Sequence, residues 1–133
     1  KNFKQLIKND VARRKEAQKI LDMRKVKTGR DYYLVAMIFH HATGITHAKK
    51  AVSFAKKSME LGYEKAKWLF AATTDRLLTK QGKKQKYGTQ FFKKTPNSKT
   101  VLRPIDPKTT DEERIKFNVP SLKELQKNIN CKF

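Results

Sequence analysis

The chain has 133 residues and carries 32 Lys and Arg against 12 Asp and Glu, for a formal net charge of +20. This length suits one domain with one hydrophobic core, and an apolar fraction of 38% argues against a disordered chain. No apolar run approaches the roughly 20 residues that cross a bilayer, and no Cys and His cluster has the spacing of a zinc site. We therefore expect no transmembrane segment, no metal and no other cofactor.

The N-terminal part of the chain predicts a helical segment over residues 1–27. The pattern changes at residues 28–31, where Thr28 and Asp31 have the spacing of a helix-capping box. The run YYLVAMIF that follows, residues 32–39, is apolar throughout. By itself it fits a buried strand or a buried helix equally well.

An internal similarity favours the helix. Tyr33 and Ala36 recur as Tyr63 and Ala66, at a spacing of 30 residues. Residues 45–63 between them have the clearest amphipathic helical pattern. Residues 31–80 therefore predict a core of stacked antiparallel helical hairpins, which resembles Sel1-like and tetratricopeptide repeats. Six small side chains would let these helices approach closely, namely Ala36, Ala51, Ala55, Ala66, Ala71 and Ala72.

The character of the chain changes after residue 80. Residues 81–110 form a basic region whose short extended stretches, 87–92 and 100–103, could pair as a β-hairpin or wrap as an irregular loop. Capping boxes that begin at Thr110 and Ser121 predict two short helices within residues 111–130. We therefore expect a single, mainly α domain over residues 1–133, with helical hairpins first and the loop or β-hairpin and short helices after them.

The positive charge is concentrated in residues 76–105, which contain nine Lys or Arg and no Asp or Glu. A strongly basic surface attracts polyanions, and nucleotides, nucleic acid or an anionic membrane are its usual partners. A requirement for solubility would also account for part of this excess.

A candidate acid/base pair follows from the repeat spacing. If Tyr33 packs beside Tyr63, then His41 lies near Ala71, and Asp75 lies one helical turn further along the same face. A histidine oriented by a carboxylate is a recurring arrangement for proton transfer. The alternative is a histidine satisfied within a helix interface, and the residues alone leave both interpretations open.

The loop QKYGTQ, residues 85–90, fits neither a Walker motif nor GxGxxG. Gly88 allows close approach of the backbone, and the amide side chains offer hydrogen-bond donors and acceptors. Such a loop could hold a phosphate, or it could brace itself against the helices. Tyr87 could stack on a base, whereas we expect Trp68 and Phe92 to be core residues.

Together these residues resemble the signature of DUF6624, a bacterial domain family of unknown function. That signature has a helix ending in QH, a DR pair, the motif GxPQxYGTQ, a DxxR or RR element and a closing G-[LV]-x-P-L. The match covers residues 31–122, with His40, Lys84 and Asn118 where the family has Gln, Pro and Gly. The resemblance implies that one site contains His41, Asp75, Arg76, Gln85, Tyr87, Gly88, Thr89, Gln90 and Arg114. It implies no particular reaction.

Two functional hypotheses follow. In the first, the site binds a nucleotide-like phosphate compound, His41 and Asp75 serve a hydrolase or transferase, and Arg76 and Arg114 hold the anion. In the second, the domain is a binding module without chemistry. It would then be either a helical-repeat groove for a protein partner or a nonspecific nucleic-acid binder.

The cellular location is only weakly indicated by the sequence. The single cysteine, Cys131, cannot form an internal disulfide, which favours a cytoplasmic protein. Secretion stays open because the sequence begins at Lys1 rather than at a methionine.

Overall fold

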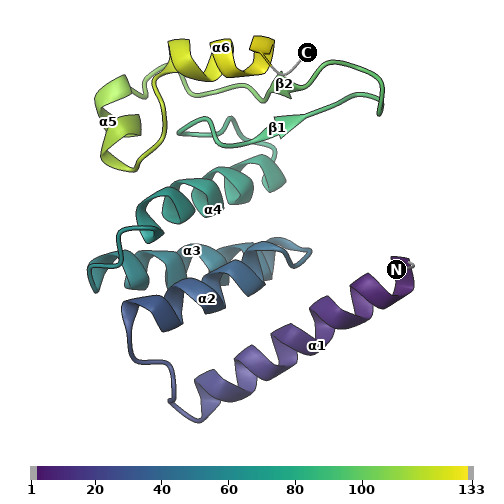
Figure 1. Cartoon of the computed structure of the whole chain (residues 1–133), viewed down its shortest axis with the longest axis vertical. Coiled ribbons are helices and arrows are strands. Elements are labelled where there is room, and N and C mark those ends of the chain that lie inside the picture. Colours follow the sequence, from purple (N-terminus) through teal and green to yellow (C-terminus); the bar gives the residue numbers. More distant parts are fainter. Residues whose placement is uncertain (1–2, 132–133) are drawn as a thin grey trace.

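The computed structural model describes residues 3–131, and the side-chain surroundings of residues 11–127. The elements in chain order are α1 (Phe3–Asp22), α2 (Gly29–His40), α3 (Ile45–Glu60), α4 (Ala66–Lys80), β1 (Phe91–Phe92), β2 (Val101–Leu102), α5 (Asp111–Lys116) and α6 (Leu122–Cys131). Helices α1 to α4 follow one another along the long axis, and the strand pair, α5 and α6 cover the end of the stack opposite α1 (Figure 1). The expected mainly α fold with packed helical hairpins is confirmed.

The region after α4 forms the β-hairpin rather than an irregular loop. β1 and β2 are antiparallel, with Phe91 opposite Leu102 and Phe92 opposite Val101. Just before this hairpin, Gln85 makes an isolated parallel bridge with Ile105. The chain that leaves α4 and the chain that leaves β2 are therefore held side by side.

The run YYLVAMIF is helical because its N-terminus is capped and its neighbours are helices. Thr28 Oγ1 accepts a hydrogen bond from the Asp31 amide at 3.1 Å, and Asp31 Oδ2 accepts one from the Thr28 amide at 3.0 Å. The rings of Tyr33 and Tyr63 pack with their centroids 5.1 Å apart, as the repeat predicts. Tyr33 of α2 therefore lies beside the segment just before α4, as the 30-residue spacing indicates.

The small side chains are buried where these helices meet. Ser58 of α3 also donates a hydrogen bond to the Gly29 carbonyl at the start of α2. Close packing requires side chains without bulk on the facing surfaces. All six alanines singled out in the sequence have 0% exposure, namely Ala36, Ala51, Ala55, Ala66, Ala71 and Ala72.

Three apolar clusters follow one another along the stack. Val35 and Phe39 pack with Ala17 of α1, and Leu69 packs with alanines of α2 and α3. The third cluster joins α4 to the C-terminal part through Ala71, Tyr87, Val119 and Leu125. The loop region is therefore part of the folded core rather than an appendage.

The expectation for Trp68 is wrong. This side chain is 45% exposed on α4, because Leu69 and Ala72 occupy the faces that pack against other elements. Phe92 is partly buried, with the Arg103 guanidinium carbon 4.9 Å from its ring centroid.

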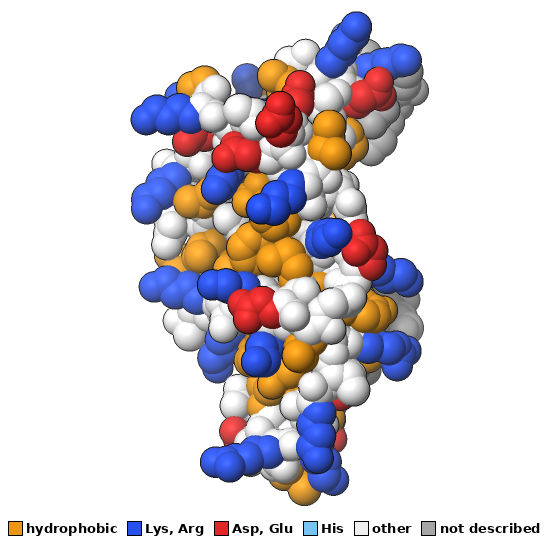
Figure 2. All heavy atoms as spheres, turned by 90° about the vertical axis from the view of Figure 1, so that its left-hand side faces the viewer, with side chains coloured by type: hydrophobic (Ala, Val, Ile, Leu, Met, Phe, Trp, Pro, Cys, Tyr) orange, Lys and Arg blue, Asp and Glu red, His pale blue; other side chains and the backbone are white. Residues whose placement is uncertain are grey.

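Lysine and arginine side chains project over the whole length of the face shown in Figure 2, while hydrophobic side chains gather in its middle. Within the described part of the chain, no helix is long and apolar enough to cross a membrane.

Candidate functional site

The carboxylate of Asp75 anchors the loop at residues 85–90. Its Oδ1 atom accepts hydrogen bonds from the amides of Lys86 and Tyr87, both at 2.8 Å. Its Oδ2 atom accepts from the amides of Gly88 and Thr89 at 3.0 Å, and from Thr89 Oγ1 at 2.7 Å. Asp75 has 0% exposure. Successive amides that converge in this way form an anion-binding nest, and here the bound anion is the protein's own carboxylate.

Gln85 is the second element that holds this loop. Its side chain is fully buried and donates from Nε2 to the Gln90 carbonyl at 3.0 Å and to the Arg103 carbonyl at 2.8 Å. Its Oε1 atom accepts from the Gln90 amide at 2.9 Å. One amide side chain therefore fixes the backbone on both sides of the hairpin at its base.

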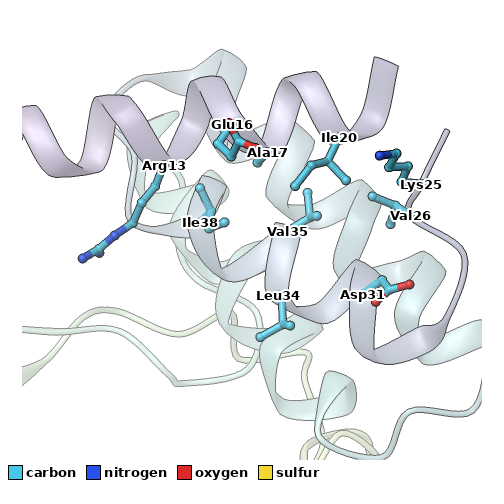
Figure 3. Close-up of a pocket in the computed structure, with 10 residues that line it drawn as sticks. All are labelled: Arg13, Glu16, Ala17, Ile20, Lys25, Val26, Asp31, Leu34, Val35 and Ile38. Atoms are coloured by element: carbon cyan, nitrogen blue, oxygen red, sulfur yellow. The ribbon is translucent and has the colours of Figure 1, made fainter. Parts of the chain in front are cut away.

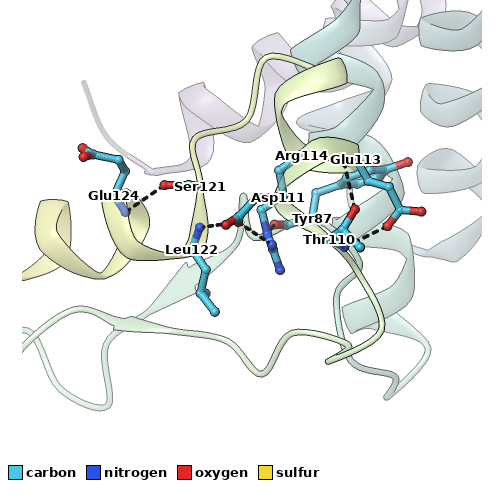
Figure 4. A network of polar contacts seen from close by, with 8 residues as sticks. All are labelled: Tyr87, Thr110, Asp111, Glu113, Arg114, Ser121, Leu122 and Glu124. Atoms are coloured by element: carbon cyan, nitrogen blue, oxygen red, sulfur yellow. Dashed lines mark hydrogen bonds and ion pairs between the residues drawn. The ribbon is translucent and has the colours of Figure 1, made fainter.

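Tyr87 and Arg114 connect the loop to the C-terminal helices. The Tyr87 ring packs edge-on against Phe117, with centroids 5.1 Å apart, and burial raises the pKa of its hydroxyl. Arg114 donates from Nε to the Tyr87 carbonyl at 3.0 Å and pairs through Nη1 with Asp111 at 2.9 Å (Figure 4). Asp111 also accepts a hydrogen bond from the Leu122 amide. These contacts fasten the loop, α5 and the start of α6 to one another.

Gly88 fits this arrangement because it has no side chain. Its φ is +117°, a conformation that L residues rarely adopt. A Cβ atom at this position would lie 2.7 Å from Leu125 Cδ1 and 3.0 Å from Ile105 Cδ1.

The predicted site therefore divides into two groups with different surroundings. One group holds the loop together and is buried apart from the partly buried Thr89; it consists of Asp75, Gln85, Tyr87, Gly88, Thr89 and Arg114. The other group, His41, Arg76 and Gln90, lies on the wall of an open cavity. The structure does not bring all nine residues to one surface.

This cavity has a volume of about 470 Å³ and lies between the ends of α2 and α4 and the β-hairpin. Arg76 and Lys80 contribute cations from α4, and Arg103 contributes one from the residue after β2. Among the described residues, no Asp or Glu lines it. The full set of lining residues is His41, Ala42, Thr43, Arg76, Thr79, Lys80, Gln90, Phe91 and Arg103.

Arg76 is held in place by two neighbouring elements. Its Nη1 atom donates to the His40 carbonyl at 2.6 Å, which satisfies a carbonyl at the C-terminal end of α2. Its Nε atom lies 3.5 Å from Gln90 Oε1. Loss of hydration lowers the pKa of Arg76. The guanidinium is therefore an ordered, partly desolvated cation at the base of the cavity.

Loss of hydration, together with the cations of the cavity, lowers the pKa values of nearby Lys80 and His40. Loss of hydration and the nearby Arg76 lower the pKa of Lys80. Loss of hydration, followed by Arg76, His41 and Lys80, lowers the pKa of His40 to about 4. The His40 imidazole is therefore neutral at pH 7, and it adds no charge to a region that already concentrates cations.

His41 and Asp75 do not form the expected pair. All five hydrogen bonds to the Asp75 carboxylate come from the loop, and no hydrogen bond joins it to His41 within residues 11–127. His41 is exposed on the cavity wall, and its ring contacts His40 with centroids 5.6 Å apart. An acid/base role for His41 stays a prediction. In the described part of the chain, the Asp75 carboxylate does not orient the His41 imidazole ring.

The sequence contained no direct indication that Lys80 and Arg103 line one cavity. Both belong to the acid-free segment 76–105, which was the available signal. Their proximity could not be read from the sequence because it depends on the hairpin register, which returns Arg103 to Gln90 through a 3.1 Å backbone hydrogen bond.

A second kind of cavity lies between α1 and α2 (Figure 3). It has a volume of about 270 Å³ and is lined mainly by aliphatic side chains such as Ile20, Val35 and Ile38. It lacks the converging cations of the first cavity.

Comparisons of the chain with protein-family models, curated proteins and solved structures found no match. The resemblance to the DUF6624 family therefore stays a prediction. Within the described residues, no group of three or more His, Cys, Asp or Glu side chains is placed to hold a metal ion.

Proposed function

We propose that the cavity between α2, α4 and the β-hairpin binds a small phosphate-bearing anion of nucleotide-like size. The observation that carries this proposal is the convergence of Arg76, Lys80 and Arg103 on one cavity, with no acidic side chain among the described residues that line it. Three cations that share a concave, partly desolvated site repel one another, and a bound anion relieves that repulsion. Arginine in particular matches phosphate oxygens with paired N–H donors.

The donors are arranged before any ligand arrives. The Arg103 guanidinium lies over the Phe92 ring, and the backbone carbonyl of Arg103 accepts a hydrogen bond from Gln85. Arg76 is fixed by the His40 carbonyl, and its Nη2 atom makes no hydrogen bond to the residues whose side chains are described. Preorganised donors lose little conformational freedom on binding. The buried part of the QxYGTQ loop therefore supports binding by positioning Gln90 and Arg103.

The remaining lining residues suit an organic phosphate better than a bare ion. Phe91 is 38% exposed and adds apolar surface to the lining of the cavity. Gln90 and Thr79 add neutral hydrogen-bonding groups. A volume of about 470 Å³ lies within the usual range for small-molecule sites. A hydrolase or transferase step through His41 and Asp75 is not part of the proposal, because the Asp75 carboxylate is already occupied by the loop.

The proposal is tested by titrating the protein with adenosine monophosphate in a calorimeter at low and at physiological salt. We expect Arg103→Ala to weaken binding by about tenfold or more, since it removes a charge-assisted contact. The matched control is Lys57→Ala, which removes one exposed cation from α3. We expect that control to change binding less than about twofold.

The proposal would be contradicted if both substitutions weakened binding equally and all binding were lost at physiological salt. Binding would then be explained by general charge attraction alone. Thermal unfolding of each variant identifies any loss of folded protein before binding is compared.

A further inference from the structure

Three cavities follow one another along α2. The middle one has a volume of about 420 Å³. It shares Leu34 and Ile38 with the cavity between α1 and α2 (Figure 3), and it shares His41 with the cationic cavity of the proposed function. The full set of residues that line the middle cavity is Arg13, Leu34, Met37, Ile38 and His41. The shared residues connect the three cavities into one path, which we call the α2 groove.

The α2 groove is apolar at one end and cationic at the other. Between α1 and α2 it is lined mainly by aliphatic side chains, such as Ile20 and Val35. At the other end Arg76 and Lys80 belong to a lining with no acidic side chain among the described residues. A ligand with an apolar tail and an anionic head would match both ends, because the tail leaves water and the head meets opposite charge.

Acidic side chains favour one direction for such a ligand. Glu16 and Asp31 line the cavity between α1 and α2. Asp31 Oδ2 accepts hydrogen bonds from the amides of Thr28 and Lys27, which lower the pKa of this carboxyl and keep it charged at neutral pH. An anionic head would be repelled from this end and attracted to the cationic cavity.

We propose that the α2 groove binds a monomeric single-chain alkyl or acyl phosphate, with its phosphate at Arg76 and Lys80 and its chain running towards Leu34. The inference rests on the proposed function, because the phosphate would occupy the same cationic cavity, and it names the class of organic phosphate. The seven residues from Leu34 to His41 rise about 10 Å along α2. A short chain would therefore end near Met37, whereas a longer chain would also cover Leu34.

Leu34 is the side chain that reports on the tail most directly. It lines both apolar cavities and is 45% exposed. A tail that covers Leu34 removes apolar surface from water on both partners. Each buried methylene group of the ligand is then expected to tighten binding about fourfold.

The test is a calorimetric titration with straight-chain phosphates from butyl to decyl, at concentrations at which they form no micelles. We expect affinity to rise about fourfold for each added methylene until the groove is filled. Leu34→Gln should weaken decyl phosphate about tenfold and change butyl phosphate less than about twofold. The matched control is Leu61→Gln, which replaces a leucine with 47% exposure that lines neither apolar cavity. We expect the control to leave both affinities within about twofold.

A second variant tests the position of the head. Lys80→Ala removes a cation from the lining of the cationic cavity and leaves the apolar lining unchanged. We expect it to weaken butyl and decyl phosphate by the same factor, because contacts at separate sites contribute independently. A loss confined to one of the two ligands would contradict a common position of the phosphate.

The outcomes separate this inference from the proposed function. If adenosine monophosphate binds but decyl phosphate binds no more tightly than butyl phosphate, the cationic cavity stands and the groove is refuted. If no phosphate compound binds, both proposals fail. Equal losses in Leu34→Gln and Leu61→Gln would also overturn the groove, as would decanol that binds as tightly as decyl phosphate. Binding to vesicles that contain phosphatidic acid, without binding of the monomeric phosphates, would overturn it in favour of a membrane surface.

Discussion

Replacing Asp75 with asparagine is expected to lower the free energy of unfolding by about 3 kcal/mol or more. The carboxylate accepts five hydrogen bonds within a fully buried site. The asparagine amide has the same shape, but its NH₂ group would face the donors that now bind one carboxylate oxygen. The remaining oxygen would still accept hydrogen bonds, but without the negative charge that strengthens them. Buried donors left without an acceptor cost about 1–3 kcal/mol each.

Chemical denaturation at neutral pH measures this change directly. A matched control is Glu112→Gln, which makes the same carboxylate-to-amide change on an exposed residue of α5, and we expect it to cost less than about 1 kcal/mol. Equal stability of the Asp75→Asn variant and the unaltered protein would show that the loop does not depend on the carboxylate.

The second large effect is expected for Gly88→Ala, at about 3 kcal/mol of destabilisation. Two independent costs add at this position. The φ of +117° is unfavourable for alanine, and the new Cβ atom would lie 2.7 Å from Leu125 Cδ1. Relief of that contact requires the ends of the Leu125 and Ile105 side chains to shift within their packing around the loop.

Gly82→Ala provides the comparison from the same region. Gly82 has a φ of +74°, and a Cβ atom there would meet no atom within 4 Å. We expect a cost of about 1 kcal/mol from backbone conformation alone. The difference between the two variants therefore isolates the packing of Gly88 against Leu125 and Ile105. If the midpoints of denaturation were equal, that close packing would be absent in solution.

The helical part of the fold was predictable because its signals are local and periodic. The capping residues Thr28 and Asp31 mark the start of α2, and the Tyr33 and Tyr63 repeat places α2 beside the segment that leads into α4. The alanine positions also show where helices approach closely. Each of these features depends on residues that are near in sequence or related by one fixed spacing.

The candidate site was less predictable because it depends on contacts between distant residues. The family resemblance grouped Asp75 with the loop at 85–90, but it gave no indication that the loop's amides bind that carboxylate. Gln85 was expected to bind a ligand because the sequence does not show whether a glutamine side chain is buried or exposed. Its three hydrogen bonds all go to the backbone of Gln90 and Arg103.

The family resemblance placed nine residues in one site, whereas the structure divides them between two kinds of surroundings. A recurring motif can reflect a demanding scaffold as well as a ligand, since an anchored loop also requires particular residue types at fixed positions. Six of the nine residues form that scaffold, and the cavity beside it includes two cations, Lys80 and Arg103, that the motif does not contain.

We propose that the cavity of Arg76, Lys80 and Arg103 binds a phosphate-bearing ligand. The most direct measurement is a titration of ¹⁵N-labelled protein with adenosine monophosphate at physiological salt, followed by amide chemical shifts. We expect saturable shifts that concentrate at the residues lining the cavity, above all Thr79, Lys80, Gln90, Phe91 and Arg103. Shifts that spread evenly over the lysines of α3, or that fail to saturate, would contradict the claim and leave only a charged surface.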